Sequence, residues 1–203
     1  MAIDAATYEA VGRDPLQPLL CGGASAARLA FFGRDPGRDE VRWMEPLIGA
    51  SGRLVRDGVH QALFGRPTTS FEELRRVSES VFFSNTVPYK PVGNKPWPDA
   101  VVERFRPITA EVLAEVWTGE HLITLGNVAF LWFGAPAEAH WAREDRYERP
   151  LVVDWPRRMT LHPLPHPSPA NARWHAKFPA MLAARLAEIG VQRGAVPVGV
   201  PAG

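Results

Sequence analysis

The sequence has a single cysteine, almost no net charge and no long apolar run, and each of these absences excludes a class of protein. Cys21 alone cannot build a disulfide framework, a four-cysteine zinc site or a conventionally ligated iron–sulfur cluster. The 23 basic and 22 acidic residues leave a charge of +1, so no global field attracts a polyanion. No stretch reaches about 18 uninterrupted apolar residues, and the N-terminus lacks the pattern of a secretory signal. We therefore expect a cytoplasmic protein without membrane contact.

Motifs for metal and thiol chemistry are missing as well. The sequence has no His-Glu-x-x-His, no Cys-x-x-Cys and no EF-hand loop, so we predict neither a metal nor a cofactor. Cys21 lacks the signature of a nucleophilic cysteine, and we expect it to be structural. At 203 residues the chain predicts one domain, 28–190, between an N-terminal segment, 1–27, and a C-terminal tail, 191–203. We expect a monomer.

Four short apolar runs, each followed by turn residues, predict a parallel sheet. Short runs without alternation are typical of strands that are buried on both faces. We place these strands at 28–33, 81–85, 121–126 and 158–162. Helical patterns occupy Leu54–Phe64, Phe71–Val77, Ala100–Trp117 and Phe178–Ile189. Strands alternating with helices predict an α/β fold, a three-layer α/β/α sandwich around a central four-stranded parallel sheet.

Polar side chains follow three of these strands on loops rich in proline and glycine. In open parallel sheets, ligands bind beyond the carboxyl ends of the strands. Asp35, Asn85 and His166 should therefore converge on one cleft as a carboxylate, an amide and an imidazole. The sequence predicts a site for a ligand at this edge of the sheet.

Two loops at that edge suit a catalytic role, although each has a structural alternative. The glycines of Gly33–Gly37 allow a tight turn whose N–H groups face a ligand, but an ordinary turn closed by Asp35 would have the same sequence. Four prolines stiffen His162–Pro169, so its histidines are held with little entropy left to lose. Such rigidity suits acid–base work, and an exposed proline turn is the alternative.

Charge placement indicates a locally anionic partner. No acidic residue occurs in 155–187, where the chain average predicts about 3.6. A second acid-free window, 80–98, contains Lys90 and Lys95. Basic loops on a neutral protein suit a partner with phosphates, although chance and buried strands could also produce these windows.

Five short motifs follow one another on the expected strand ends. They are Gly33–Glu40, Pro46–Gly52, Ser84–Lys95, Leu125–Ala129 and His166–Pro169. In this order they resemble the motifs of the uracil-DNA glycosylase superfamily over residues 28–188. The resemblance is closest to its bacterial and archaeal iron–sulfur branch, but the cluster is missing. Tyr89 stands where a cluster cysteine would be, and Cys21 has no three partners.

The resemblance implies a reaction for the three residues at the strand ends. Base excision breaks an N-glycosidic bond through an oxocarbenium-like sugar, after the nucleotide has been flipped out of the stack. By resemblance, Asp35 activates water, His166 donates to the oxygen of the leaving base, and Asn85 pairs with the uracil edge. No lysine nucleophile is evident. The resemblance therefore implies a monofunctional glycosylase for uracil or a related deaminated base in single- or double-stranded DNA.

The resemblance also implies a wider set of contacts. Leu47 replaces the Phe that stacks on the base in the family, and Phe31 or Phe32 on the preceding strand could compensate. The implied base contacts are Asn85, Leu47, Phe32, Gly33 and Arg34. The implied DNA contacts are Gly49, Ser51, Gly52, Lys90, Lys95, Ser168, Pro169, Asn171, Arg173 and Lys177.

Two other functions stay open on the sequence. A non-catalytic DNA-binding relative is favoured by Leu47, while Asp35, Asn85 and His166 together argue against it. A nucleotide-binding or hydrolytic α/β domain unrelated to DNA would bind a free nucleotide and show no affinity for DNA at low salt.

Overall fold

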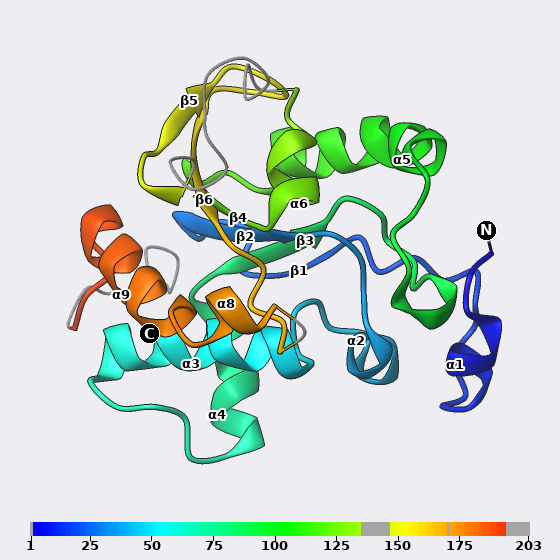
Figure 1. The fold of residues 1–203 in the computed structure, drawn as a ribbon, viewed down its shortest axis with the longest axis horizontal. Helices are drawn as coiled ribbons and strands as arrows, with labels where there is room; N and C mark the ends of the chain where they lie inside the picture. Colours follow the sequence, from blue (N-terminus) through cyan, green and yellow to red (C-terminus); the bar gives the residue numbers. More distant parts are fainter. Residues whose placement is uncertain (1, 135–146, 170, 194–203) are drawn as a thin grey trace.

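A computed structural model describes residues 2–134, 147–169 and 171–193 and contains a six-stranded sheet with the order β1-β3-β2-β4-β6-β5 (Figure 1). The four central strands are parallel to one another. They are β3 (Phe82–Asn85), β2 (Leu29–Gly33), β4 (His121–Leu125) and β6 (Met159–Leu164). Two antiparallel strands of three residues close the edges, β1 (Cys21–Gly23) beside β3 and β5 (Leu151–Val153) beside β6. The carboxyl ends of the four central strands therefore lie at one edge of the sheet.

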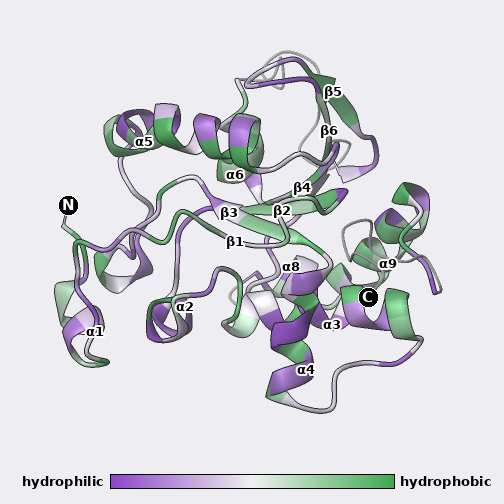
Figure 2. Cartoon of the chain, turned by 180° about the vertical axis from the view of Figure 1, so that it is seen from behind, coloured by the Kyte–Doolittle hydropathy of each residue, from purple (hydrophilic) through white to green (hydrophobic). Residues whose placement is uncertain are grey.

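Helices cover both faces of the sheet and give two separate cores. One face is covered by α3 (Ala50–Phe64), α4 (Phe71–Arg76) and α9 (Phe178–Ile189), and the other by α5 (Asp99–Glu111) and α6 (Asn127–Leu131) (Figure 1). Side chains alternate along a strand, so Phe31 packs into the first core and its neighbour Phe32 into the second. Figure 2 shows that the central strands are mainly hydrophobic and that the helices carry both hydrophobic and hydrophilic residues.

The predicted strands and helices are confirmed, but the predicted number of strands was wrong. The structure adds β1 and β5, whose three residues each are too few to show a periodic pattern. α9 spans the predicted residues, while α3 begins four residues early because Gly49 is its N-cap. The predicted helix over Ala100–Trp117 continues past α5 as a π-helical segment, Val112–Val116.

The N-terminal segment is packed onto the body of the protein. Its short helix α1 (Ala5–Glu9) lies beside the loop that follows β3. The backbone N–H of Asp4 donates to the carbonyl of Lys90 at 3.0 Å, and the Lys90 ammonium pairs with the Asp4 carboxylate at 2.7 Å. The hydroxyl of buried Tyr8 accepts from the Lys90 N–H at 3.1 Å. The sheet and its supports thus begin before residue 28. Residues 194–203 of the predicted tail lie outside the described residues.

Within the described ranges, no helix combines the length and hydropathy that crossing a membrane requires.

Candidate active site

Asp35 follows β2 on a tight loop and is held by its neighbour. The side chain is only 4% exposed, and the Arg34 guanidinium donates to both carboxylate oxygens, with Nη2 at 3.1 Å from Oδ2. The same Nη2 donates to the carbonyl of Asn94 at 3.0 Å, which fixes the guanidinium in place. Burial raises the pKa of Asp35, and the nearby charges of Arg34 and Lys90 oppose this shift. The Asp35 side chain is therefore buried and paired with a neighbouring positive charge.

Asn85 ends β3 directly beside Gly33, its partner across the parallel ladder. The residue is 3% exposed, and its Nδ2 has no hydrogen-bond partner among the described residues. A Cβ at position 33 would lie 2.6 Å from the Asn85 Oδ1, so a glycine at 33 lets the amide lie against the backbone. Because buried amide groups are normally paired, an unpaired one at a strand end is suited to a ligand.

His166 reaches the same edge from the proline-rich loop after β6. Burial and the nearby charge of Arg34 lower the pKa of His166 to about 4, so its imidazole is neutral near pH 7. Gly126, directly after β4, packs against His166: a Cβ on Gly126 would lie 3.0 Å from the His166 Cβ. The Asn171 Nδ2 donates to the His166 carbonyl at 3.3 Å. A neutral imidazole keeps one N–H donor and one acceptor.

The other histidine of this loop lies elsewhere. His162 is within β6, 3% exposed, with Nε2 3.0 Å from the Nδ1 of His121 and Nδ1 3.4 Å from Arg185 on α9. Burial and the Arg185 charge lower its pKa to about 3. Of the two histidines, only His166 lies beyond the end of the sheet.

Leu47 lies beside Gly33 and Asn85. Its Cδ2 would be 3.9 Å from a Cβ built on Gly33, and the residue is 8% exposed. Its φ of 51° lies in the left-handed region, which is rare for a branched aliphatic residue. Strained backbone of this kind is found preferentially at functional sites.

Glu40, on α2 (Arg38–Trp43), joins the two loops that bring Asp35 and Leu47 to this edge. One carboxylate oxygen accepts from the Gly37 N–H at 3.0 Å and the other from the Gly49 N–H at 2.8 Å. In the sequence Glu40 is only the last position of the first motif, and this bridge was not predicted. Glu40 lies nine residues from Gly49, and no sequence pattern predicts a hydrogen bond at that separation.

The model for the Uracil DNA glycosylase superfamily matches residues 22–190. The chain belongs to this superfamily. The match begins within β1 and ends just after α9, so it includes the four central strands together with Asp35, Asn85 and His166. No curated protein matches the chain. Superfamily membership supports a glycosylase hydrolase that acts on DNA.

Two residues that the glycosylase resemblance implied as contacts, Phe32 and Lys90, are packed against other parts of the protein. Phe32 is fully buried in the core, with its ring centroid 5.1 Å from Trp132 and 5.5 Å from Phe133, so it offers no surface to a base. The alternation along β2 places Phe31 in the opposite core, also fully buried. Lys90 is 4% exposed and paired with Asp4, because the N-terminal segment covers it. The Phe32 ring and the Lys90 ammonium are thus both engaged within the protein, and their implied contacts with the base and with DNA remain predictions.

The remaining predicted DNA contacts of this superfamily member surround the strand ends. Lys95, Pro169, Arg173 and Lys177 are exposed, and Ser51, Ser168 and Asn171 are half-buried. On α8 (Ala172–His175) and just after it, Arg173 and Lys177 lie 5.1 and 5.7 Å from the ring centroid of Trp174. Gly49 and Gly52 are buried: the first donates to Glu40, and the second lies against the Leu47 carbonyl. Ala170, between the predicted contacts Pro169 and Asn171, lies outside the described residues.

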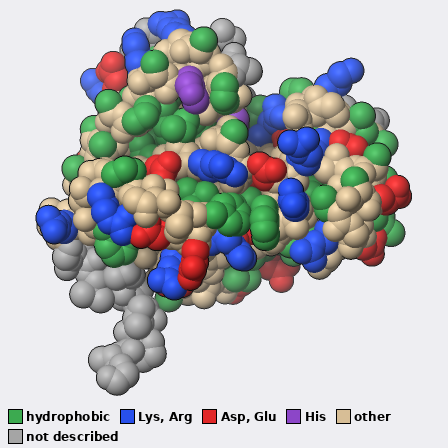
Figure 3. Space-filling view, turned by 90° about the horizontal axis from the view of Figure 1, so that it is seen from below, with side chains coloured by type: hydrophobic (Ala, Val, Ile, Leu, Met, Phe, Trp, Pro, Cys, Tyr) green, Lys and Arg blue, Asp and Glu red, His purple; other side chains and the backbone are tan. Residues whose placement is uncertain are grey.

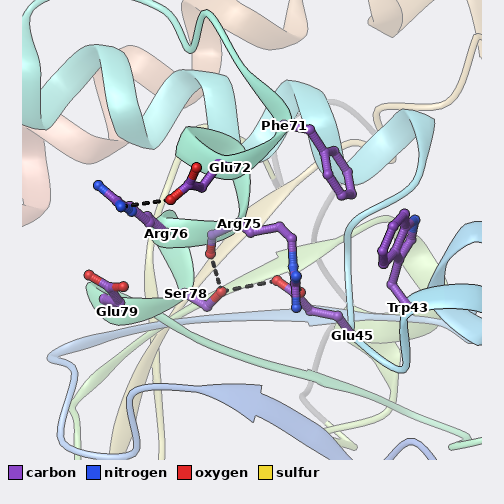
Figure 4. A pocket seen from close by; sticks show the side chains of 8 residues that line it. All are labelled: Trp43, Glu45, Phe71, Glu72, Arg75, Arg76, Ser78 and Glu79. Carbon is purple, nitrogen blue, oxygen red and sulfur yellow. Dashed lines mark hydrogen bonds and ion pairs between the residues drawn. The ribbon is translucent and has the colours of Figure 1, made fainter.

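A pocket of about 530 Å³ lies between α2 and α4 (Figure 4). It is lined by Trp43, Glu45, Phe71, Glu72, Arg75, Arg76, Ser78 and Glu79. Charges of both signs surround apolar groups on this side of the molecule (Figure 3). None of the lining residues belongs to the set at the strand ends. In the described part of the chain, no group of three or more His, Cys, Asp or Glu side chains could hold a metal ion.

Proposed function

We propose that this protein is a monofunctional DNA glycosylase that hydrolyses the N-glycosidic bond of uracil or a related deaminated base. One observation carries the proposal: Asp35, Asn85 and His166 lie at the carboxyl ends of the parallel strands β2, β3 and β6, and the buried Asn85 Nδ2 has no hydrogen-bond partner among the described residues. We also propose that it acts in the cytoplasm as a monomer, and that it is a cluster-free relative of the iron–sulfur branch.

The unpaired amide supports recognition of a base edge. Uracil presents a carbonyl acceptor beside an N–H donor, and one amide side chain offers the complementary donor and acceptor. Within the described ranges the Asn85 Nδ2 has no acceptor, while the backbone hydrogen bonds between β3 and β2 fix the strand that carries it. A base lacking this pair of groups would leave the buried amide unsatisfied, which costs about 1–3 kcal/mol.

The charges at the strand ends suit heterolysis. As the bond from the sugar C1′ to the base nitrogen breaks, its electron pair goes to the base and positive charge develops on the sugar. Asp35 stabilises that charge and takes a proton from the water that attacks C1′. The N–H of His166 donates to the base oxygen, where negative charge is growing. The products are the free base, protonated from solvent, and an abasic sugar.

The positions of the lysines support the monofunctional assignment. A bifunctional glycosylase needs an amine that attacks C1′. Lys90 is buried and paired with Asp4, and exposed Lys95 and Lys177 lie on surface segments suited to phosphate. Water is therefore the nucleophile in this proposal.

The test is an excision assay on oligonucleotides that each contain one uracil, hypoxanthine, xanthine or substituted pyrimidine, in single- and double-stranded form. Alkali cleaves the strand wherever a base has been removed, so a gel reports abasic sites directly. We expect removal of at least one deaminated base, without strand cleavage before alkali. DNA binding without excision of any base would instead support the non-catalytic relative.

A further inference from the structure

The loop that carries Leu47 is fixed by one buried guanidinium. Arg56 on α3 is 0% exposed, and its Nε donates to the Leu47 carbonyl at 2.7 Å. Its Nη2 donates to the Pro46 carbonyl at 2.9 Å. Two consecutive carbonyls are thus held by one planar group whose nitrogens have fixed relative directions.

The other side of Arg56 is fixed as firmly. Its Nη1 donates to the Leu74 carbonyl at 3.1 Å and to the Ser78 hydroxyl at 3.2 Å. The Glu45 carboxylate lies 2.9 Å from Nη2 and balances the charge. The guanidinium carbon also lies 4.4 Å from the ring centroid of Phe83, on β3. Arg56 is therefore fixed by contacts with both α4 and β3.

The conformation that Arg56 holds is one that Leu47 would not adopt by itself. A left-handed leucine is disfavoured by roughly 1–2 kcal/mol. On α3, Gly52 lies one turn before Arg56, and a Cβ there would be 2.0 Å from the Leu47 carbonyl oxygen. Gly52 admits the carbonyl, and Arg56 then binds it. Together they turn the Leu47 side chain toward Gly33 and Asn85.

We propose that Arg56 is a positioning residue for the base-binding site, because its bonds to the Pro46 and Leu47 carbonyls set the Leu47 side chain against the flipped base. This inference rests on the proposed function. Arg56 does not contact the base itself. It acts through the backbone of Leu47, so its removal should lower the preference for a damaged nucleotide and leave phosphate contacts unchanged.

The test measures binding to an oligonucleotide that contains 2′-fluoro-2′-deoxyuridine, which resists hydrolysis, against the same oligonucleotide with thymidine. Arg56→Lys keeps the charge but loses the paired donors, and we expect it to reduce the preference for the fluorinated probe about tenfold. Leu47→Gly should have a similar effect, and the double variant should be no worse than either single variant. Binding of the thymidine oligonucleotide should not change.

Arg75→Gln is the matched control, because Arg75 pairs with the same Glu45 carboxylate at 2.8 Å but its side chain lines the pocket of Figure 4. It should keep the wild-type preference. If Arg56→Lys does not fold, Arg56→Met takes its place, since it removes the buried charge together with its bonds. The inference would be overturned by a folded Arg56 variant that keeps the wild-type preference for the fluorinated probe. It would also be overturned if the effects of the Arg56 and Leu47 substitutions added in the double variant. In either case, excision by the wild type would still support the proposed function. A wild type without excision and without preference would overturn both.

Discussion

The ion pair between Asp35 and Arg34 influences the protonation of two residues at the strand ends. The guanidinium occupies both carboxylate oxygens and lies close enough to His166 to disfavour a second positive charge there. Arg34 thus opposes the rise that burial causes in the Asp35 pKa, and it adds to the burial that lowers the His166 pKa. An ionised Asp35 and a neutral His166 are the protonation states that the proposed hydrolysis needs.

Arg34→Gln should therefore change the pH dependence of excision. Arg34 opposes the rise in the Asp35 pKa that burial causes, so its removal lets that pKa rise further. The acid limb of the single-turnover rate, where Asp35 becomes protonated, should move to higher pH. Rates measured between pH 4 and 8 would show this shift. Arg38→Gln, which removes an exposed charge three residues beyond Asp35, should leave the limb in place, and an unmoved limb in Arg34→Gln would contradict the role.

At the scale of elements, the central strands and main helices could be predicted because each is buried along an uninterrupted run or one face. β2 is buried at all five positions, and α9 begins and ends where its apolar spacing does. The ends of parallel strands meet at one edge by geometry, so Asp35, Asn85 and His166 could be placed together. β1 and β5 could not be found, because three residues show no period.

Contacts between side chains that lie far apart in the chain also could not be predicted from the sequence. Lys90 lies in an acid-free window, which suggested phosphate, but its partner Asp4 comes from 86 residues away. Phe32 follows Phe31 on a strand buried on both faces, so neither ring could be assigned to a site from its neighbours. The bonds of Arg56 and Glu40 to loop carbonyls and N–H groups depend on tertiary packing alone.

The contact between α1 and the loop after β3 should be a measurable part of stability. Asp4→Ala leaves the Lys90 ammonium buried without its carboxylate, so we expect unfolding to become easier by about 1–3 kcal/mol. Urea denaturation at pH 7 measures this difference. Asp14→Ala, on an exposed turn of the same segment, should change stability much less. Equal effects of the two substitutions would mean that the buried pair contributes nothing specific.

The basic side chains around the strand ends should determine the salt dependence of DNA binding. Lys95→Ala, Arg173→Ala and Lys177→Ala should each weaken binding and reduce the slope of log affinity against log salt by about one. Arg158→Ala removes a guanidinium that is 77% exposed near the opposite end of β6, and its slope should match the wild type. If the slopes of the Lys95, Arg173 and Lys177 variants all matched the wild type, these side chains would not contact DNA phosphates.

Two histidines whose pKa values are lowered in the folded protein should make its stability sensitive to acid. The folded pKa of His162 is about 3, against 6.5 for an ordinary histidine. Between these values the unfolded chain binds more protons, so stability is complete above about pH 6.5 and is lost as the pH falls toward 3. His166 adds a similar loss toward pH 4. His162→Gln should lower the pH slope of the unfolding free energy by up to about 1.4 kcal/mol per pH unit. Urea denaturation between pH 5 and 7 checks this, and an unchanged slope would contradict it.

Single-turnover excision by His166→Ala is the sharpest measurement of whether the residues at the strand ends act in the transition state of base excision. The His166 donor gains most when the base oxygen becomes anionic, so it should favour the transition state over bound substrate. We predict that the wild type removes a deaminated base and that His166→Ala does so about 10²–10³-fold more slowly. DNA affinity should change far less, since phosphate contacts supply most of it. Excision by His166→Ala at the wild-type rate would contradict the account.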